Sequence, residues 1–246
     1  FHAGDLVAVG GDGRHRITGR KKEIYKNRQG QTIAPQRIEN LFRDFEGIGQ
    51  AFVVGDSREY NTLLVWPNPA SPAMAGKKPE QVRQLLSSLV ASANRFLAPF
   101  ERVVAFDLLD RPLDEEHGEL TLKQTFKREA VERNWAGPID RMYEQKQLSL
   151  AVGGTTVRIP TWVLREIGLL RHEFSLEGGL LRAGARRLAL GAAPDAPGSL
   201  YIGELAYASP TPVFDLGALL SRPALWLGNE GVRRFLGEEA FSSVAF

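Results

Sequence analysis

The chain has 246 residues, and its 31 Lys and Arg against 29 Asp and Glu give a formal net charge of +2. This balance does not by itself indicate a nucleic-acid or membrane surface. The absence of cysteine excludes disulfides, thiolate nucleophiles and cysteine-based zinc sites, and four scattered histidines predict no metal site. No apolar run approaches about 18 residues and no signal-peptide pattern opens the chain, so we expect a cytoplasmic protein.

A change in texture near residue 147 predicts two domains, residues 1–145 and residues 148–246. The sequence opens on FHAGDL without an initiator Met, which leads us to expect a fragment that lacks an N-terminal region.

The first domain is predicted to be an α+β module of short strands packed under two or three helices. Apolar periodicity and turn signals predict strands at 6–9, 14–18, 22–26, 51–56, 62–67 and 103–109, and helices from 34–35 to about 46, over 79–96 and over 127–135. The residues predicted to lie in its core include Trp66, Phe96, Phe100, Phe106 and Phe126.

The second domain is predicted to be a β-rich α+β accessory unit of unknown function. Its short strands are broken by Gly-Gly and Pro, and helices are expected at 161–170 and 223–237. Trp162, Trp226, Tyr201 and Tyr207 are interpreted as packing residues. Two roles remain open for this unit, a partner-docking scaffold and a small-ligand sensor.

Two residues near the start of the chain suit a nucleotide. Asp5 in FHAGDL offers a carboxylate to sugar hydroxyls, and Arg20 in ITGRKK offers a planar fork of donors to ribose or phosphate oxygens. The Gly-Asp-Gly hairpin between them could bring both to one side. The basic stretch 14–28 also allows a nucleic-acid module, but Tyr25 is its only aromatic residue, so we expect no nucleic-acid partner.

Three motifs in order, FHAGDL, ITGRKKEIYKNRQGQTIAPQRIE and HGELTLKQTFKRE, resemble the C-terminal portion of AMP-forming acyl-CoA synthetases of the long-chain fatty-acid type. The resemblance covers about residues 1–143. It implies the small mobile lid domain of these ligases, with fatty acid, ATP, CoA and Mg²⁺ handled mainly by a missing N-terminal domain. The reaction it implies joins the fatty acid to AMP and then transfers the acyl group to CoA. An acyl-AMP ligase that loads a carrier protein is the alternative, and peripheral membrane association is a further expectation.

The resemblance also assigns roles to individual residues. Asp5 and Arg20 match ribose-binding positions, although Ala3 replaces the Thr that usually precedes this motif's Gly-Asp. Lys22 falls at the hinge, so the domain hinge is expected near residues 20–22. Rotation about it would present Lys26 and Gly30 to the CoA and thioester step.

The resemblance also implies a lysine that stabilises the α-phosphate, but this sequence departs from the family's usual pattern at that position. Thr125 occupies its usual position, and Lys123 and Lys127 stand two residues to either side. In an extended loop, a two-residue step keeps a side chain on the same face. Because the segment GELTLKQT resembles a variant form of the family's motif, Lys123 is the predicted catalytic residue, and Lys127 is the alternative.

Overall fold

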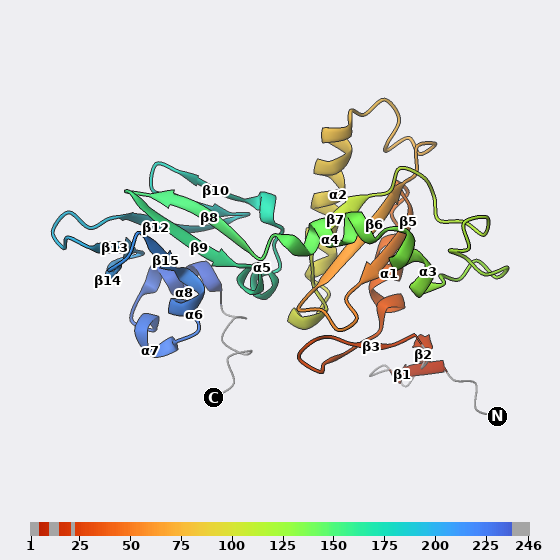
Figure 1. Cartoon of the computed structure of the whole chain (residues 1–246), viewed down its shortest axis with the longest axis horizontal. Helices are drawn as coiled ribbons and strands as arrows, with labels where there is room; N and C mark the ends of the chain where they lie inside the picture. The colour runs from red at the N-terminus through yellow and green to blue at the C-terminus, as the bar shows by residue number, and fades with distance from the viewer. Residues whose placement is uncertain (1–4, 10–14, 21–22, 238–246) are drawn as a thin grey trace. The chain divides into compact units, whose positions relative to one another are not determined.

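The computed structural model describes residues 5–9, 15–20 and 23–237, and the side chains of residues 23–237. The chain divides into two compact units, residues 1–144 and residues 145–246 (Figure 1). Each unit buries a hydrophobic core of its own.

A three-stranded sheet forms the centre of the first unit. Its order is β5 (Ile48–Val54), β6 (Asn61–Pro67) and β7 (Val103–Leu108), with β5 antiparallel and β7 parallel to β6. The parallel pair requires a crossover, which contains the helix α2 (Pro79–Asn94). The continuous apolar runs at 51–54 and 63–65 are buried throughout, as expected for strands covered on both faces.

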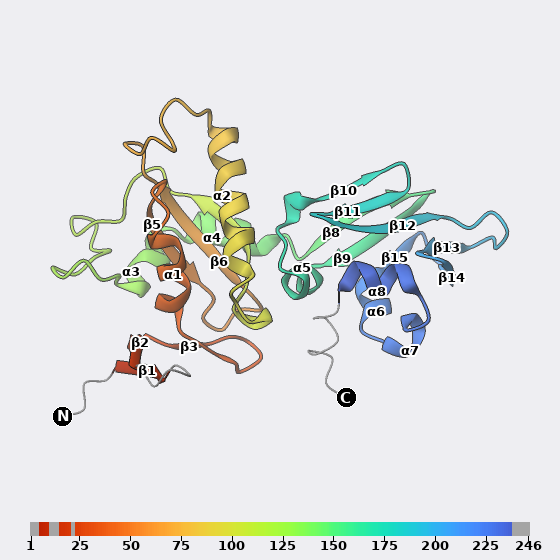
Figure 2. The same cartoon turned by 180° about the vertical axis from the view of Figure 1, so that it is seen from behind.

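Helices lie on both sides of this sheet. The helix α4 (Ala136–Glu144) lies in front of it in Figure 1, whereas α2 lies in front of it in the reverse view of Figure 2. One face packs against α4 and the preceding helix α3 (Arg128–Asn134). This part of the core contains Phe52, Val54, Leu64, Val131, Trp135 and Ile139.

Two small antiparallel pairs precede the sheet. They are β1 (Asp5–Val9) with β2 (His15–Arg20), and β3 (Tyr25–Lys26) with β4 (Thr32–Ile33). The strand expected at 22–26 is therefore only two residues long in the described part of the chain.

The helix α1 (Pro35–Arg43) begins where the sequence predicts, with Pro35 in its first turn. Ile38 and Phe42 are buried on its apolar face. The helix ends at Arg43, about three residues earlier than predicted.

The predicted core residues of the first unit differ in burial, and Trp66, Phe100 and Phe126 are half-buried. Phe96 is 73% exposed, whereas Phe106 is buried as predicted. The helix α2 ends at Asn94, so Phe96 lies beyond the helical period that predicted its burial. A short 3₁₀ turn at Pro99–Glu101 then leads into β7.

The second unit contains two sheets. β8 (Gln147–Val152), β9 (Thr155–Pro160) and β15 (Val213–Asp215) form a three-stranded sheet in the order β15-β9-β8. The other is an antiparallel meander. Its strands are β10 (Phe174–Glu177), β11 (Leu180–Ala183), β12 (Arg186–Ala192), β13 (Ser199–Ile202) and β14 (Leu205–Ala208). A 3₁₀ turn at Arg171–Glu173 precedes β10.

Its helices are shorter than predicted. They are α5 (Thr161–Ile167), α6 (Leu216–Leu220), α7 (Pro223–Trp226) and α8 (Glu230–Leu236). Gly168 ends α5 with a left-handed φ of 73°. The helix expected over 223–237 is divided because Asn229 accepts a hydrogen bond from the Val232 amide and caps α8 instead of continuing α7.

Packing of the aromatic residues in this unit is uneven. Trp226 is buried and its indole N–H donates to the Leu220 carbonyl at 3.0 Å, whereas Trp162 is 37% exposed, against the prediction.

Among the described residues, no helix combines the length and apolar character needed to cross a bilayer.

The two phenylalanines Phe52 and Phe96 provide a test of this core. Phe52→Ala should lower the free energy of unfolding of the first unit by about 3–5 kcal/mol, because it removes a fully buried ring. Phe96→Ala should change it by less than about 0.5 kcal/mol, because that ring is exposed. Native-state hydrogen exchange of amides in β6 measures both. Equal losses of protection in the two variants would contradict the assignment of the core.

Candidate functional site

Residues 119–127 form a hairpin, here called the lysine hairpin, between β7 and α3. Leu120 and Phe126 form an antiparallel bridge, and the Thr121 amide donates to the Thr125 carbonyl at 2.9 Å. The hydroxyls of Thr121 and Thr125 lie 2.7 Å apart. Lys123 is exposed in the turn between these threonines, so the hairpin presents its ammonium group to solvent.

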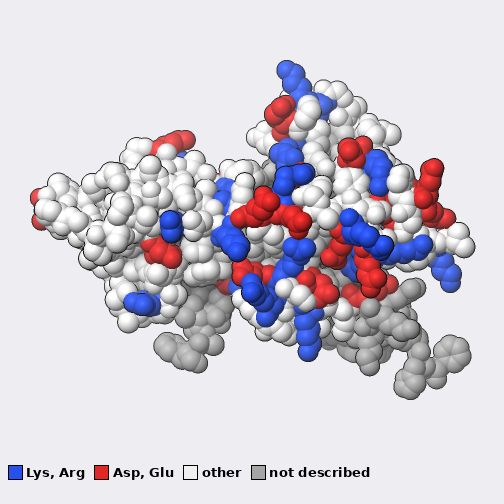
Figure 3. All heavy atoms as spheres, in the orientation of Figure 1, with Lys and Arg blue, Asp and Glu red and all other residues white. Residues whose placement is uncertain are grey.

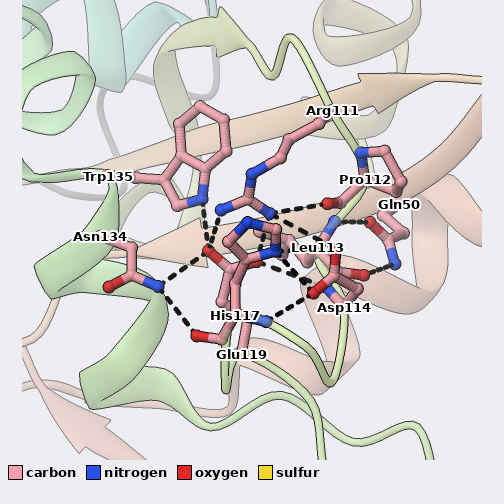
Figure 4. Close-up of polar contacts among 9 residues, drawn as sticks. All are labelled: Gln50, Arg111, Pro112, Leu113, Asp114, His117, Glu119, Asn134 and Trp135. Carbon is pink, nitrogen blue, oxygen red and sulfur yellow. Dashed lines mark hydrogen bonds and ion pairs between the residues drawn. The ribbon is translucent and has the colours of Figure 1, made fainter.

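The base of the lysine hairpin is anchored by the buried carboxylate of Glu119 (Figure 4). Arg111 donates to both carboxylate oxygens at 2.7 Å, and Asn134 and Trp135 donate to Oε1 at 3.1 and 3.0 Å. The Asp114 amide donates to Oε2 at 3.3 Å. A carboxylate with this set of donors is satisfied, which explains how a charged group is accommodated at a fully buried position.

These contacts determine the ionisation of the site. Burial alone would raise the pKa of Glu119, but the hydrogen bonds from Arg111, Asn134 and Trp135 outweigh it and hold that pKa below its ordinary value. The hydrogen bond between Arg111 and Glu119 raises the pKa of Arg111. The Arg111 guanidinium also lies 5.1 Å from the centre of the Trp135 ring. The group is therefore an ion pair at neutral pH.

Asp114 organises the turn that precedes the hairpin. Its carboxylate accepts from the His117 amide at 2.8 Å and lies 2.8 Å from the His117 ring nitrogen Nδ1. The His117 amide and ring both lower the pKa of Asp114. These contacts hold residues 114–117 in a turn.

Side chains also fix both flanks of the connection that carries the hairpin. Gln50 pairs with the Leu113 backbone, donating to its carbonyl at 2.9 Å and accepting from its amide at 2.6 Å. At the far end, Arg128 donates to Glu39 at 2.9 Å and to the Val53 carbonyl, and its guanidinium lies 4.3 Å from the centre of the Phe52 ring. The hairpin is thereby tied to the central sheet before and after the lysine.

A groove of about 520 Å³ lies beside the lysine hairpin. Its walls come from α1, from the edge strand β5 and from residues 124–126 of the hairpin. Thr125, the position where the resemblance places the usual lysine, lines this groove and bonds to Thr121.

The structure corrects the sequence argument that linked Lys123 and Lys127. Residues 121–125 form a turn, in which Gln124 has a φ of 58°, and not an extended loop. The rule that alternate side chains share a face therefore does not apply here. Lys123 lies at the tip, whereas Lys127 lies at the base, where its amide donates to the Glu119 carbonyl at 2.8 Å and its own carbonyl begins α3.

The nucleotide-binding and hinge predictions concern a less fully described part of the chain. The backbones of Asp5 and Arg20 are direct partners in the β1–β2 pair. The side chains of Asp5 and Arg20 are not among those that the structure describes, and Lys22, the predicted hinge, lies wholly outside the described residues.

Lys26 and Gly30 belong to a second, separately organised loop. The amide of Ser57 donates to the Lys26 carbonyl, and the amide of Arg28 donates to the Arg58 carbonyl, both at 2.8 Å. Lys26 is exposed, and Gly30 has a φ of 81° with open space around the position of a Cβ. Glycine is thus required there for backbone conformation and not for a close contact within the described residues.

Asn27 holds this loop together and was not singled out from the sequence. It is buried, and its side-chain oxygen accepts from the amides of Gln29 and Gln31 at 3.1 and 2.9 Å. An asparagine that starts a turn before a glycine is a recognised signal for such an arrangement. Arg28 in the same loop pairs with Glu59 at 2.9 Å, so its charge is used within the chain.

On the face drawn in Figure 3, basic and acidic side chains are interspersed over the first unit. The ion pairs of the first unit include those of Arg83 and Arg141, which both pair with Asp107 at 3.2 Å. This face offers mixed charge rather than a basic stripe.

Four residues that carry the site's structure were missed as functional positions: Arg111, Glu119, Arg128 and Asn27. Glu119 and Arg128 stood in GELT and FKR, where the sequence marked the motif but not its contacts. The partners of Glu119 lie 8 residues before it and 15 and 16 after it, at no helical or strand period. Periodicity could not have paired them.

The model of the AMP-binding enzyme C-terminal domain family matches residues 25–147. The chain belongs to this family. The match ends three residues into the second unit, and it includes the lysine hairpin and the Gly30 loop. It confirms the resemblance on which the sequence interpretation depended.

Curated relatives agree with this assignment. The chain is 31% identical over 161 residues to long-chain-fatty-acid–CoA ligase FadD15 of Mycobacterium tuberculosis, covering 59% of this chain and 27% of the relative. It is 32% identical over 163 residues to the peroxisomal long chain acyl-CoA synthetase 6 of Arabidopsis thaliana, covering 59% of this chain and 23% of that protein. The chain thus spans about a quarter of the length of the curated relatives that it matches.

A solved structure shows the same fold. The adenylation domain of a carboxylate reductase from Mycobacterium chelonae superposes with a TM-score of 0.50 at 23% identity, covering 58% of this chain and 23% of that one. The α+β class predicted from the sequence is confirmed by this match and by the family.

The lowered pKa of Glu119 predicts how pH changes the stability of the first unit. The unfolded chain takes up a proton near the ordinary value of 4.5, before the folded one does. The stabilisation is therefore complete above that value and is lost as pH falls through the lowered pKa of the folded protein. The free energy of unfolding, measured by urea denaturation between pH 6 and pH 3, should fall with pH in the parent chain and fall less steeply in Glu119→Gln. An equal pH dependence of this free energy in the two proteins would contradict the ion pair.

Proposed function

We propose that this chain supplies the C-terminal lid of an AMP-forming long-chain acyl-CoA synthetase. In this reaction a fatty acid attacks the α-phosphorus of ATP, releasing pyrophosphate and forming acyl-AMP, and the acyl group then passes to the thiol of CoA. The observation that carries the proposal is the exposed Lys123 on a hairpin within the matched family region. The named activities of the curated relatives support the fatty acid and CoA as substrates.

Lys123 would act in the first half-reaction. Negative charge increases on the phosphate oxygens as the carboxylate attacks, and a positioned cation lowers the energy of that transition state. The lysine hairpin has the properties that this role needs, since its base is fixed and its ammonium group is free to meet a phosphate. Asp5 and Arg20, which are backbone partners, would hold the ribose hydroxyls.

The loop of residues 26–31 would act in the second half-reaction. The lysine hairpin and this loop occupy different places on the first unit (Figure 1). A rotation near residues 20–22 would exchange one for the other, leaving Lys26 to meet phosphates of CoA or AMP and Gly30 to line the thiol's path. The preformed Asn27 turn supports this assignment, because the loop needs no ordering before it meets a ligand.

ATP requires Mg²⁺ in reactions of this type. The described residues contain no group of three or more His, Asp or Glu side chains that could hold a metal ion. The proposal therefore assigns Mg²⁺, and the acyl pocket that decides chain length, to the larger part of the synthetase.

Lys123→Ala tests the proposal in the complete protein that carries this chain. The variant should lose at least about a hundredfold in ATP–pyrophosphate exchange, the effect of removing one electrostatic stabiliser. The rate of acyl-CoA formation from supplied acyl-AMP and CoA should change by less than about threefold, because that step does not use the hairpin.

Lys77→Ala is the matched control, since it removes an exposed lysine from a loop outside the site. Lys127→Ala distinguishes the alternative lysine. Near-normal ATP–pyrophosphate exchange in Lys123→Ala would remove this residue from the mechanism. A selective loss of this exchange in Lys127→Ala would transfer the role to Lys127.

A further inference from the structure

The Glu119 carboxylate connects three parts of the first unit that are distant in sequence. Its hydrogen bonds come from Arg111, from the Asp114 amide and from Asn134 and Trp135 at the C-terminal end of α3. Five donor contacts exceed the approximately four lone-pair sites of a carboxylate, so the group is saturated. Its position is therefore fixed relative to both flanks of the connection.

The backbone of Glu119 passes this constraint to the hairpin. Its amide donates to the Asp114 carbonyl at 2.9 Å, and its carbonyl accepts from the Lys127 amide at 2.8 Å. The residue consequently fixes both the first and the last strand position of the hairpin. At the tip, Gln124 also donates to Glu115 at 2.7 Å.

From this arrangement we infer that Glu119 is a positioning residue for Lys123. The carboxylate sets the direction in which the lysine hairpin leaves the domain, and so the pose in which the ammonium group reaches the reacting phosphate. This role rests on the proposed function, although the anchoring itself does not. A lysine on an unanchored loop would sample many directions, and only a fraction of them would be productive.

The chemistry of the anchor requires a carboxylate. In Glu119→Gln, one oxygen becomes an NH₂ group that faces the donors of Arg111 or of Trp135, because each carboxylate oxygen accepts from a donor that cannot reverse. The variant also loses the charge that pairs with Arg111. It retains the size and shape of the side chain, so its effect should be a looser hairpin.

Hydrogen exchange of the present chain tests the anchor without any activity. The readout is the exchange rate of amides 120–127 divided by that of amides in β6. In Glu119→Gln this ratio should rise at least about tenfold, because the charge-assisted fork from Arg111 is lost. A residue that stabilised the whole unit alike would raise both rates together and leave the ratio unchanged, and a ratio within about twofold of the parent overturns the inference.

Glu101→Gln is the matched control. Glu101 is also a buried carboxylate that pairs with an arginine, Arg37, and accepts a backbone amide, that of Ala98. It lies before β7, away from the hairpin, and its substitution should leave the ratio unchanged. Should Glu119→Gln fail to fold, Arg111→Lys keeps the charge, removes the two-point fork and should raise the ratio at least about threefold.

The half-reactions of the complete protein separate this inference from the proposed function. Glu119→Gln should lower ATP–pyrophosphate exchange at least about tenfold and change acyl transfer from supplied acyl-AMP by less than about twofold. A raised hydrogen-exchange ratio with both half-reactions unchanged would overturn the positioning of Lys123 while leaving the anchor in place. Loss of activity in Glu119→Gln with normal activity in Lys123→Ala would instead overturn the proposed role of the lysine.

Discussion

The structure of the site depends on one constraint, which is that the connection from β7 to α3 runs through residues 109–127 without a neighbouring strand for most of its length. Backbone groups on such a segment need partners, and water cannot reach those that are buried. Side chains supply the partners here. Glu119 binds the Asp114 amide, and Gln50 binds both backbone groups of Leu113. Polar side chains therefore order the connection together with the backbone hydrogen bonds of the lysine hairpin.

Polar side chains also protect the free edge of β5. In the β5–β6 pair, Val53 directs its backbone groups away from β6, because its amide donates to Glu39 and its carbonyl accepts from Arg128. An uncovered edge strand is open to pairing with other chains. The Glu39–Arg128 ion pair blocks this edge at Val53 and at the same time fixes the residue that follows the hairpin. One interaction thus covers the edge of β5 at Val53 and contributes to the geometry of the site.

Sequence patterns predicted the elements that depend on local chemistry. Pro35 marked the start of α1, and the apolar runs marked β5, β6 and β7, because burial on both faces requires uninterrupted apolar residues. Long-range polar contacts were not predictable in this way. Glu119 and its partner Trp135 are separated by a turn and a helix, and no rule of spacing connects them. Phe96 shows the opposite limit, since its helical period indicates burial only while the helix continues, and α2 ends two residues earlier.

In the proposed function, a single lysine on a hairpin serves as the catalytic group, and the arrangement of the hairpin favours this role. Ordering a lysine side chain costs about 1.5–2 kcal/mol of conformational entropy, and ordering each backbone residue of a flexible loop costs about 1–2 kcal/mol more. In the lysine hairpin, the backbone cost is met during folding by the Thr121–Thr125 pair and by the contacts of Glu119. In the proposed reaction, only the side chain of Lys123 then remains to be ordered when the phosphate binds. The binding energy that a flexible loop would spend on its own ordering stays available to stabilise the transition state.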